Sequence, residues 1–134
     1  MSSDIETAVR RLVYTSVPVS RNRRTDLDQI LAQARRNNGV NGVSGLLVAD
    51  TDRYVQVLEG TPEAVSFIMD VILSDGRHTD VRVLSDELAE ERAFGGWTMA
   101  NLPGGGDEFA VCRQLHHLLQ GAPASVKDAF SILG

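Results

Sequence analysis

Residues 53–60 read Arg-Tyr-Val-Gln-Val-Leu-Glu-Gly, and the rest of the fold is built around this stretch. It is rich in β-branched and aromatic residues and predicts a strand. The two-residue period of a strand places Tyr54, Gln56 and Leu58 on one face and Val55 and Val57 on the other. Because both faces carry apolar side chains, we expect an inner strand. The buried amide of Gln56 is costly without a hydrogen-bond partner, so the remainder of the chain should supply one.

Stretches on both sides predict an alternation of strands and helices. Leu27, Ile30, Leu31 and Ala34 recur at helical spacing after an expected N-cap at Thr25. That helix should run to Asn37 or Asn38 and end at Gly39. A second helix should start at Thr61-Pro62-Glu63 and end at Asp75-Gly76. The expected strands are 10–17, 42–49, 53–60, 81–84 and 96–100.

The order β-α-β-β-α-β-β predicts an α+β, ferredoxin-like sheet with both helices on one face. In such a sheet we expect the first and third strands to be the central, adjacent and parallel pair. Tyr14 and Gln56 would then lie on neighbouring strands. If both point to the helix side, the phenol and the amide meet.

The opposite face of the sheet carries valines and needs a cover. After the glycine-rich stretch 103–106, a helix at 107–120 and a short one around 126–133 are expected to form this lid. The expected lid contacts are Phe109, Cys112, Leu115 and Leu119 from the first helix, and Val126, Ala129, Phe130 and Leu133 from the second. The triglycine suggests that the lid can move or exchange with a partner.

Composition excludes several classes of protein. The chain of 134 residues is 43% hydrophobic and carries a net charge of −5, which argues against a nucleic-acid binder. A single cysteine allows no internal disulfide and no cysteine-based zinc site. His116 and His117 diverge by roughly 100° on a helix, so we expect no metal between them. There is no apolar run of membrane-span length and no signal-peptide core, so we predict a soluble, cytoplasmic protein.

Several separated motifs together resemble the BLUF family, the sensors of blue light using FAD. The motifs are Tyr14-x-Ser16, Asn37-Asn38, Gly42-Val-Ser-Gly45-Leu-Leu, Gln56-Val-Leu-Glu-Gly60, Asp75-x-Arg77-His78 and Arg92-x-Phe94-x-x-Trp97-x-Met99. Each alone has an ordinary explanation as a strand tyrosine, a helix end, a turn or core filling. Their joint occurrence in this order favours the family, over roughly residues 9–101.

The resemblance implies a chemical role for three residues. FAD would lie between the two sheet-facing helices, with its ring against the central strands. Tyr14 would give an electron and a proton to the excited flavin, and Gln56 would stand between Tyr14 and flavin N5 and O4. Asn38 would hold the polar edge of the ring. An amide both donates and accepts, so Gln56 can relay the proton and remain in a changed form. A stronger hydrogen bond to O4 should then shift absorption to the red.

The resemblance also implies further cofactor-binding and signal-coupling residues. The remaining cofactor-binding residues would be Ser16, Arg35, Asn37, Asp75, Arg77 and His78, with Arg35 placed to meet the diphosphate. Trp97 and Met99 are two residues apart and are expected on one face of the last strand, where they would report the state of the amide. The chain departs from the common pattern at Val43-Ser44, Ala49 and Tyr54. Tyr54 could act as a second, off-pathway electron donor.

Two other functions fit parts of the pattern. A small acylphosphatase-type enzyme needs a phosphate-cradling loop after the first strand, but Pro18-Val-Ser has no glycine-rich cradle beside its arginines. An RNA-binding sheet needs exposed aromatic residues on its open face, where this chain has valines. We therefore expect a photoreceptor without catalytic turnover.

The expected organisation is a tail at 1–8, a flavin-binding domain at 9–101 and a helical cap at 102–134. About thirty residues after position 101 are too few for an output domain, so we expect the signal to pass to a separate effector protein. A homodimer or larger oligomer through the lid helices or the valine face is a hypothesis. Neither nucleic acid nor a membrane is an expected partner.

Overall fold

The computed structural model of the protein describes residues 9–18, 23–49, 53–74, 78–102 and 108–130. The predicted tail at 1–8, the triglycine at 104–106 and Leu133 lie outside these residues. The strands are β1 (Val9–Pro18), β2 (Ser44–Ala49), β3 (Tyr54–Gly60), β4 (His78–Ala89) and β5 (Ala100–Leu102). The helices are α2 (Arg23–Asn41), α3 (Pro62–Leu73), α4 (Glu108–Leu119) and α5 (Ala124–Ala129).

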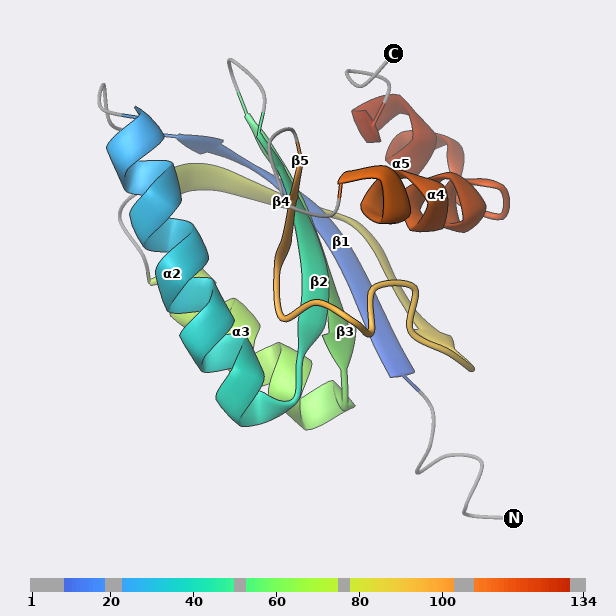
Figure 1. The fold of residues 1–134 in the computed structure, drawn as a ribbon, viewed down its shortest axis with the longest axis horizontal. Coiled ribbons are helices and arrows are strands. Elements are labelled where there is room, and N and C mark those ends of the chain that lie inside the picture. The colour runs from blue at the N-terminus through green and yellow to red at the C-terminus, as the bar shows by residue number, and fades with distance from the viewer. Residues whose placement is uncertain (1–8, 19–22, 50–52, 75–77, 103–107, 131–134) are drawn as a thin grey trace.

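The five strands form one sheet between two helical layers. The strand order is β4-β1-β3-β2-β5, with β3 at the centre. Figure 1 shows α2 and α3 on one side of the sheet and α4 and α5 on the other. This confirms the predicted α+β, ferredoxin-like arrangement with helices over both faces.

The expected parallel pairing of the two central strands is wrong. β1 and β3 are adjacent but antiparallel, and β3 is also antiparallel to β2. The reason is topological: β3 lies between the two strands that the α2 crossover joins, so it runs against both. In the antiparallel register Tyr14 is directly opposite Gln56, and such a pair shares one face.

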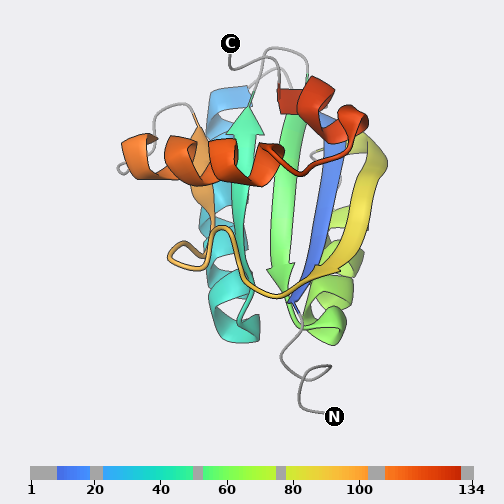
Figure 2. The same cartoon turned by 90° about the vertical axis from the view of Figure 1, so that its right-hand side faces the viewer.

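Alternation along β3 separates two hydrophobic cores. On the helix face, Tyr54 and Leu58 are buried with Tyr14 and residues of α2 and α3. On the lid face, Val55 and Val57 are buried beneath α4 and α5. Figure 2 shows the lid helices lying across the strands. The predicted burial of both faces of β3 and the predicted cover over the valines are both confirmed.

Helix ends follow local capping chemistry. The hydroxyl of Thr61 accepts a hydrogen bond from the Ala64 N–H at 3.2 Å, and Pro62 occupies the first turn, as predicted. By contrast, α2 begins at Arg23 and does not use Thr25 as its N-cap. It also continues past Gly39 to Asn41. Gly42, at φ 68°, follows the helix in the left-handed conformation that suits glycine at a helix end.

The other boundaries also differ from those predicted. β4 extends over twelve residues because nearly its whole length pairs with β1, whereas 81–84 was expected. β5 begins only at Ala100, where 96–100 was expected.

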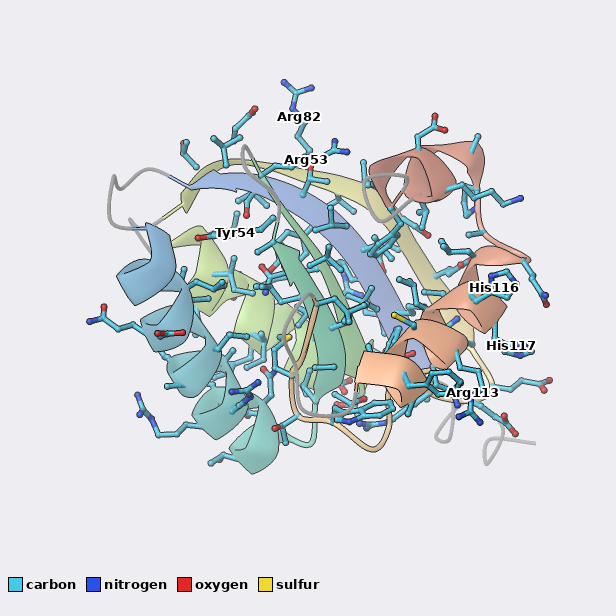
Figure 3. All side chains as sticks on the ribbon, turned by 45° about the horizontal axis from the view of Figure 1, so that its top comes forward. Arg53, Tyr54, Arg82, Arg113, His116 and His117 are labelled. Atoms are coloured by element: carbon cyan, nitrogen blue, oxygen red, sulfur yellow. The ribbon has the colours of Figure 1, made fainter. Side chains whose placement is uncertain are left out.

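The contact face of α4 differs from the predicted one. Val111 and Leu115 are buried against the sheet, whereas Phe109 is 81% exposed and Cys112 is exposed. The rotation of α4 about its own axis is set by how the helix docks on the sheet. The spacing of apolar residues in the sequence did not determine this rotation. Figure 3 shows Arg113, His116 and His117 on the side of α4 that faces away from the sheet, and all three are exposed. In α5, the predicted contacts Val126, Ala129 and Phe130 are buried.

Candidate flavin site

The centre of the candidate site is a buried pair of polar side chains on β1 and β3. Tyr14 is fully buried and Gln56 is 2% exposed. The Tyr14 hydroxyl donates a hydrogen bond to Oε1 of Gln56. The antiparallel register brings the two side chains together, and this is the partner that the sequence required for the amide.

A small cavity lies beside this pair, between α2 and α3. It has a free volume of about 30 Å³. Its walls combine aliphatic side chains with amides from α2 and β3. The lining residues are Ile30, Gln33, Ala34, Asn37, Asn38, Gln56, Leu58, Ile68, Val71, Ile72 and Met99. An apolar slot with a few convergent amides suits a flat ring that has polar groups along one edge.

Two buried polar atoms on this side of the sheet have no hydrogen-bond partner among the described residues. They are Oδ1 of Asn38 and Oγ of Ser16. The Nδ2 group of Asn38 is already committed, because it donates to the Thr98 carbonyl at 2.7 Å. A buried acceptor without a donor is costly, so a ligand with an N–H group would relieve it.

Of the remaining predicted cofactor-binding residues, two have side chains that the structure describes and three do not. Asn37 lines the cavity, and Arg35 lies on the exposed side of α2 with its Nε donating to the Met99 carbonyl at 3.2 Å. Asp75 and Arg77 lie outside the described residues. Of His78, only the backbone in β4 is described.

Trp97 and Met99 do not share a face, contrary to the prediction. Met99 is 3% exposed and belongs to the helix-face core, where it lines the cavity. Trp97 packs against the lid-face core, with its ring 6.4 Å from that of Phe94. The reason is local: these residues precede β5 in a loop, and the Trp97 N–H bonds to the Phe94 carbonyl in a turn. A two-residue period therefore does not apply to them.

Sequence reasoning missed two polar residues, Gln33 at the cavity and Glu59 on the opposite face of β3. Gln33 lines the cavity, and its position on the α2 stripe with Ile30 and Asn37 could have revealed it. Glu59 is 0% exposed at the end of β3. An acid inside a strand that is buried on both faces was the available signal.

The residues present fit a flavin ring. The hydroxyl–amide pair, the unpaired Asn38 oxygen and the aliphatic walls supply both the polar edge and the flat apolar contacts. In the described part of the chain, no group of three or more His, Cys, Asp or Glu residues could hold a metal ion. None of the described helices has the length and apolarity to cross a membrane.

Residues 9–100 match the family described as sensors of blue-light using FAD, BLUF. The chain belongs to the BLUF family. It is thus a blue-light sensor domain, and FAD is the cofactor of its family, as the motifs predicted. The family is one of sensors.

Solved BLUF structures share this fold. The dark-state structure of the BLUF protein BlrB is 25% identical with a TM-score of 0.72, over 90% of this chain and 91% of that one. The ground state of BlsA is 33% identical with a TM-score of 0.66, over 69% of this chain and 63% of that one.

Curated BLUF relatives include much longer proteins. The β subunit of the photoactivated adenylate cyclase of Euglena gracilis is 31% identical to this chain. The match covers 75% of this chain but only 12% of the length of that relative. The blue light- and temperature-regulated antirepressor BluF of Escherichia coli is 32% identical over 52% of this chain, which spans 17% of its length.

The family assignment also bears on the alternatives. The acylphosphatase-type alternative has no support from these relatives. The RNA-binding alternative fails because α4 and α5 cover the valine face.

Proposed function

We propose that this chain senses blue light through FAD held between α2 and α3, with Tyr14 and Gln56 as the photoactive pair. The observation that carries the proposal is the buried hydrogen bond from the Tyr14 hydroxyl to the Gln56 amide, at the wall of the amide-lined cavity. An ordinary core has little use for a phenol and a carboxamide at the centre of its sheet, where aliphatic pairs are cheaper. A relay for protons needs both groups.

Asn38 and Asn37 would hold the polar edge of the flavin, with Asn38 Oδ1 accepting from a ring N–H. Ser16, whose hydroxyl is buried without a described partner, would supply a further hydrogen bond. Arg35, on the exposed side of α2, would face the diphosphate. Parts of the cofactor farther from the sheet would contact the other predicted residues, which are Asp75, Arg77 and His78.

A flavin held here would supply the absorption of blue light and, in its excited state, a strong electron acceptor. Tyr14 is the donor, because its phenol lies within hydrogen-bonding distance of Gln56. A phenol is protonated at neutral pH, but it becomes strongly acidic when it loses an electron. Its proton therefore moves along the existing hydrogen bond to Oε1 of Gln56. The amide would release one of its own N–H protons toward the ring, and return of the electron and a proton would restore the Tyr14 phenol. The amide is then left rotated or as its tautomer, with its donor and acceptor atoms exchanged.

The changed amide is the signal, and the residues around it carry the signal outward. Met99 lines the same cavity as Gln56, and Trp97 lies two residues away in the lid-face core. A rearrangement at Gln56 therefore acts on a segment that contacts both layers. We expect this segment to signal to a separate effector protein, and we expect the protein to form a homodimer or larger oligomer. Photoactivated cyclases and an antirepressor are the outputs named among its BLUF relatives.

An absorption spectrum of the purified protein in the dark and after blue illumination tests the proposal. The flavin bands should shift to the red and return in the dark. Tyr14→Phe and Gln56→Leu should each abolish the shift while flavin remains bound. Tyr54→Phe is the matched control, because it removes the chain's other tyrosine hydroxyl on the same face of the sheet, and it should retain the shift. A normal shift in Tyr14→Phe would remove the relay from consideration.

A further inference from the structure

The carboxylate of Glu59 has no part in the photochemistry proposed above, yet it is fully buried. It follows Gln56 by three residues on β3 and points to the lid face, as Val55 and Val57 do. Its Oε2 accepts from the Arg11 Nε at 2.9 Å and from the Ala93 N–H at 2.7 Å. Its Oε1 accepts from the Phe94 N–H at 2.8 Å and from the Ser44 hydroxyl at 3.5 Å. A carboxylate suits this setting because every partner is a donor.

These hydrogen bonds hold the start of the loop that carries Trp97 and Met99, residues 90–99, which we call the connecting loop. Arg11 adds a second contact, because its Nη2 donates to the Glu91 carbonyl at 2.9 Å. The far half of the loop is held from elsewhere. The Trp97 carbonyl accepts from the Gly45 N–H at 3.2 Å, and the Thr98 carbonyl accepts from Asn38.

The first half of the connecting loop packs into the lid-face core at Ala93 and at the fully buried Phe94. A cavity of about 460 Å³ separates Glu90–Ala93 from α4 and from the turn that leads to α5. Glu90, Glu91 and Arg92 are exposed. Besides this packing, the segment is held to the sheet by the hydrogen bonds of Glu59 and Arg11 and by one from the Arg92 guanidinium to the Ser44 hydroxyl at 3.2 Å.

We propose that Glu59 is a positioning residue that holds the connecting loop in register with β3, so that Met99 stays on the flavin side and Trp97 on the lid side. The inference rests on the proposed function, since it gives the signal from Gln56 a route along its own strand to the lid. Gln56 and Glu59 share a rigid, fully buried strand, and the loop is bonded to its end. A movement of β3 at Gln56 thus reaches Trp97 through the carboxylate.

Trp97 is the only tryptophan in the chain, so its fluorescence reports the loop directly. The test measures acrylamide quenching of Trp97 in the dark and under blue light, in the wild type, Glu59→Gln and Glu87→Gln. Glu87 is the matched control, because it lines the same cavity but is exposed. Glu59→Gln keeps the side-chain size but replaces one acceptor oxygen with a donor group, which then faces an N–H group.

We expect Glu59→Gln to raise the quenching constant of Trp97 in the dark and to abolish its light-dependent change. The red shift of the flavin should keep its size, because Tyr14 and Gln56 are unaltered. Glu87→Gln should match the wild type. Arg11→Lys serves as a second variant if Glu59→Gln does not fold. It keeps the positive charge but loses the hydrogen bond to the Glu91 carbonyl. Its quenching constant should lie between that of the wild type and that of freely exposed tryptophan.

The proposal is overturned if Trp97 is quenched equally in the wild type and in the folded variants at Glu59 or Arg11. It is also overturned if wild-type quenching does not change with light while the flavin shift is present. Dark quenching requires no photochemistry. A protein that shows no light-induced shift would therefore refute the proposed function and would still reveal whether Glu59 holds the loop.

Discussion

The two faces of the central sheet differ in chemistry although they share every strand. The helix face buries a phenol, a carboxamide and an asparagine amide around a small cavity, whereas the middle of the lid face is aliphatic. Val55 and Val57 flank Gln56 on β3 and point away from it. The comparison shows how a strand can hold reactive polar groups on one side while the other side supplies stability. Lid-face substitutions should therefore lower stability and leave the photochemistry intact, whereas substitutions at the polar pair of the helix face should change both.

The largest effect on stability should come from the lid face. Phe130→Ala removes a buried ring from the lid core and should cost about 3–5 kcal/mol of the free energy of unfolding. Urea unfolding of the flavin-free protein measures this cost, and the light-induced shift of folded, flavin-loaded protein should persist.

Phe109→Ala is the control. The Phe109 side chain is exposed, and the Arg113 guanidinium lies 5.3 Å from its ring centre, so the substitution should cost at most about 1 kcal/mol. Equal costs at the two positions would contradict the contact face of α4 and α5 described here.

A smaller effect on stability should come from the helix face. There the more informative quantity is the coupling energy between Tyr14 and Gln56. Gln56→Leu removes the acceptor of the Tyr14 hydroxyl and should cost about 1–3 kcal/mol. Adding Tyr14→Phe to Gln56→Leu should recover part of that loss, because the second change removes the hydroxyl that lost its acceptor. Urea unfolding of the two single variants and the double variant gives the coupling energy. Strictly additive costs would show that the hydrogen bond contributes nothing to folding.

The smallest effect should come from an ion pair at the β1–β4 border. Arg10 donates to the Asp86 carboxylate through Nε at 2.9 Å and Nη2 at 2.8 Å. These hydrogen bonds lower the pKa of Asp86 below its ordinary value of 3.8. The stabilisation is therefore fully present above that pH and is lost as the pH falls through the lowered pKa. With side chains 23% and 42% exposed, the pair should contribute less than about 1 kcal/mol.

Asp86→Asn tests this pair when stability is measured from pH 7 down to strongly acidic conditions. The variant should be slightly less stable at neutral pH and should converge with the wild type in acid. Asp80→Asn is a suitable control, because the Arg82–Asp80 pair is longer, at 3.3 Å, and more exposed. Asparagine also tolerates the positive φ of 52° at that position. A constant difference at all pH values would exclude the ion pair as its cause.

The motifs on regular elements named residues that the fold brings together. Tyr14, Asn38 and Gln56 converge on the helix face because strand and helix periods are local properties of the chain. Predictions failed where a turn or the docking of a helix, and not a regular period, set the direction of a side chain. The turn at Phe94–Trp97 places Trp97 and Met99 on opposite faces, and no period in residues 94–99 reveals that turn. The exposed position of Cys112 likewise follows from how α4 docks on the sheet.

The amino-acid order alone was enough to establish the succession of strands and helices, the two faces of β3 and the BLUF motifs. Each of these depends on spacing along a few neighbouring residues. The antiparallel pairing of β1 with β3, the separation of Trp97 from Met99 and the attachment of the connecting loop to Glu59 emerged only from the folded chain. They join residues far apart in sequence, such as Glu59 and Phe94, and hydrogen bonds of that kind exist only after the sheet has assembled.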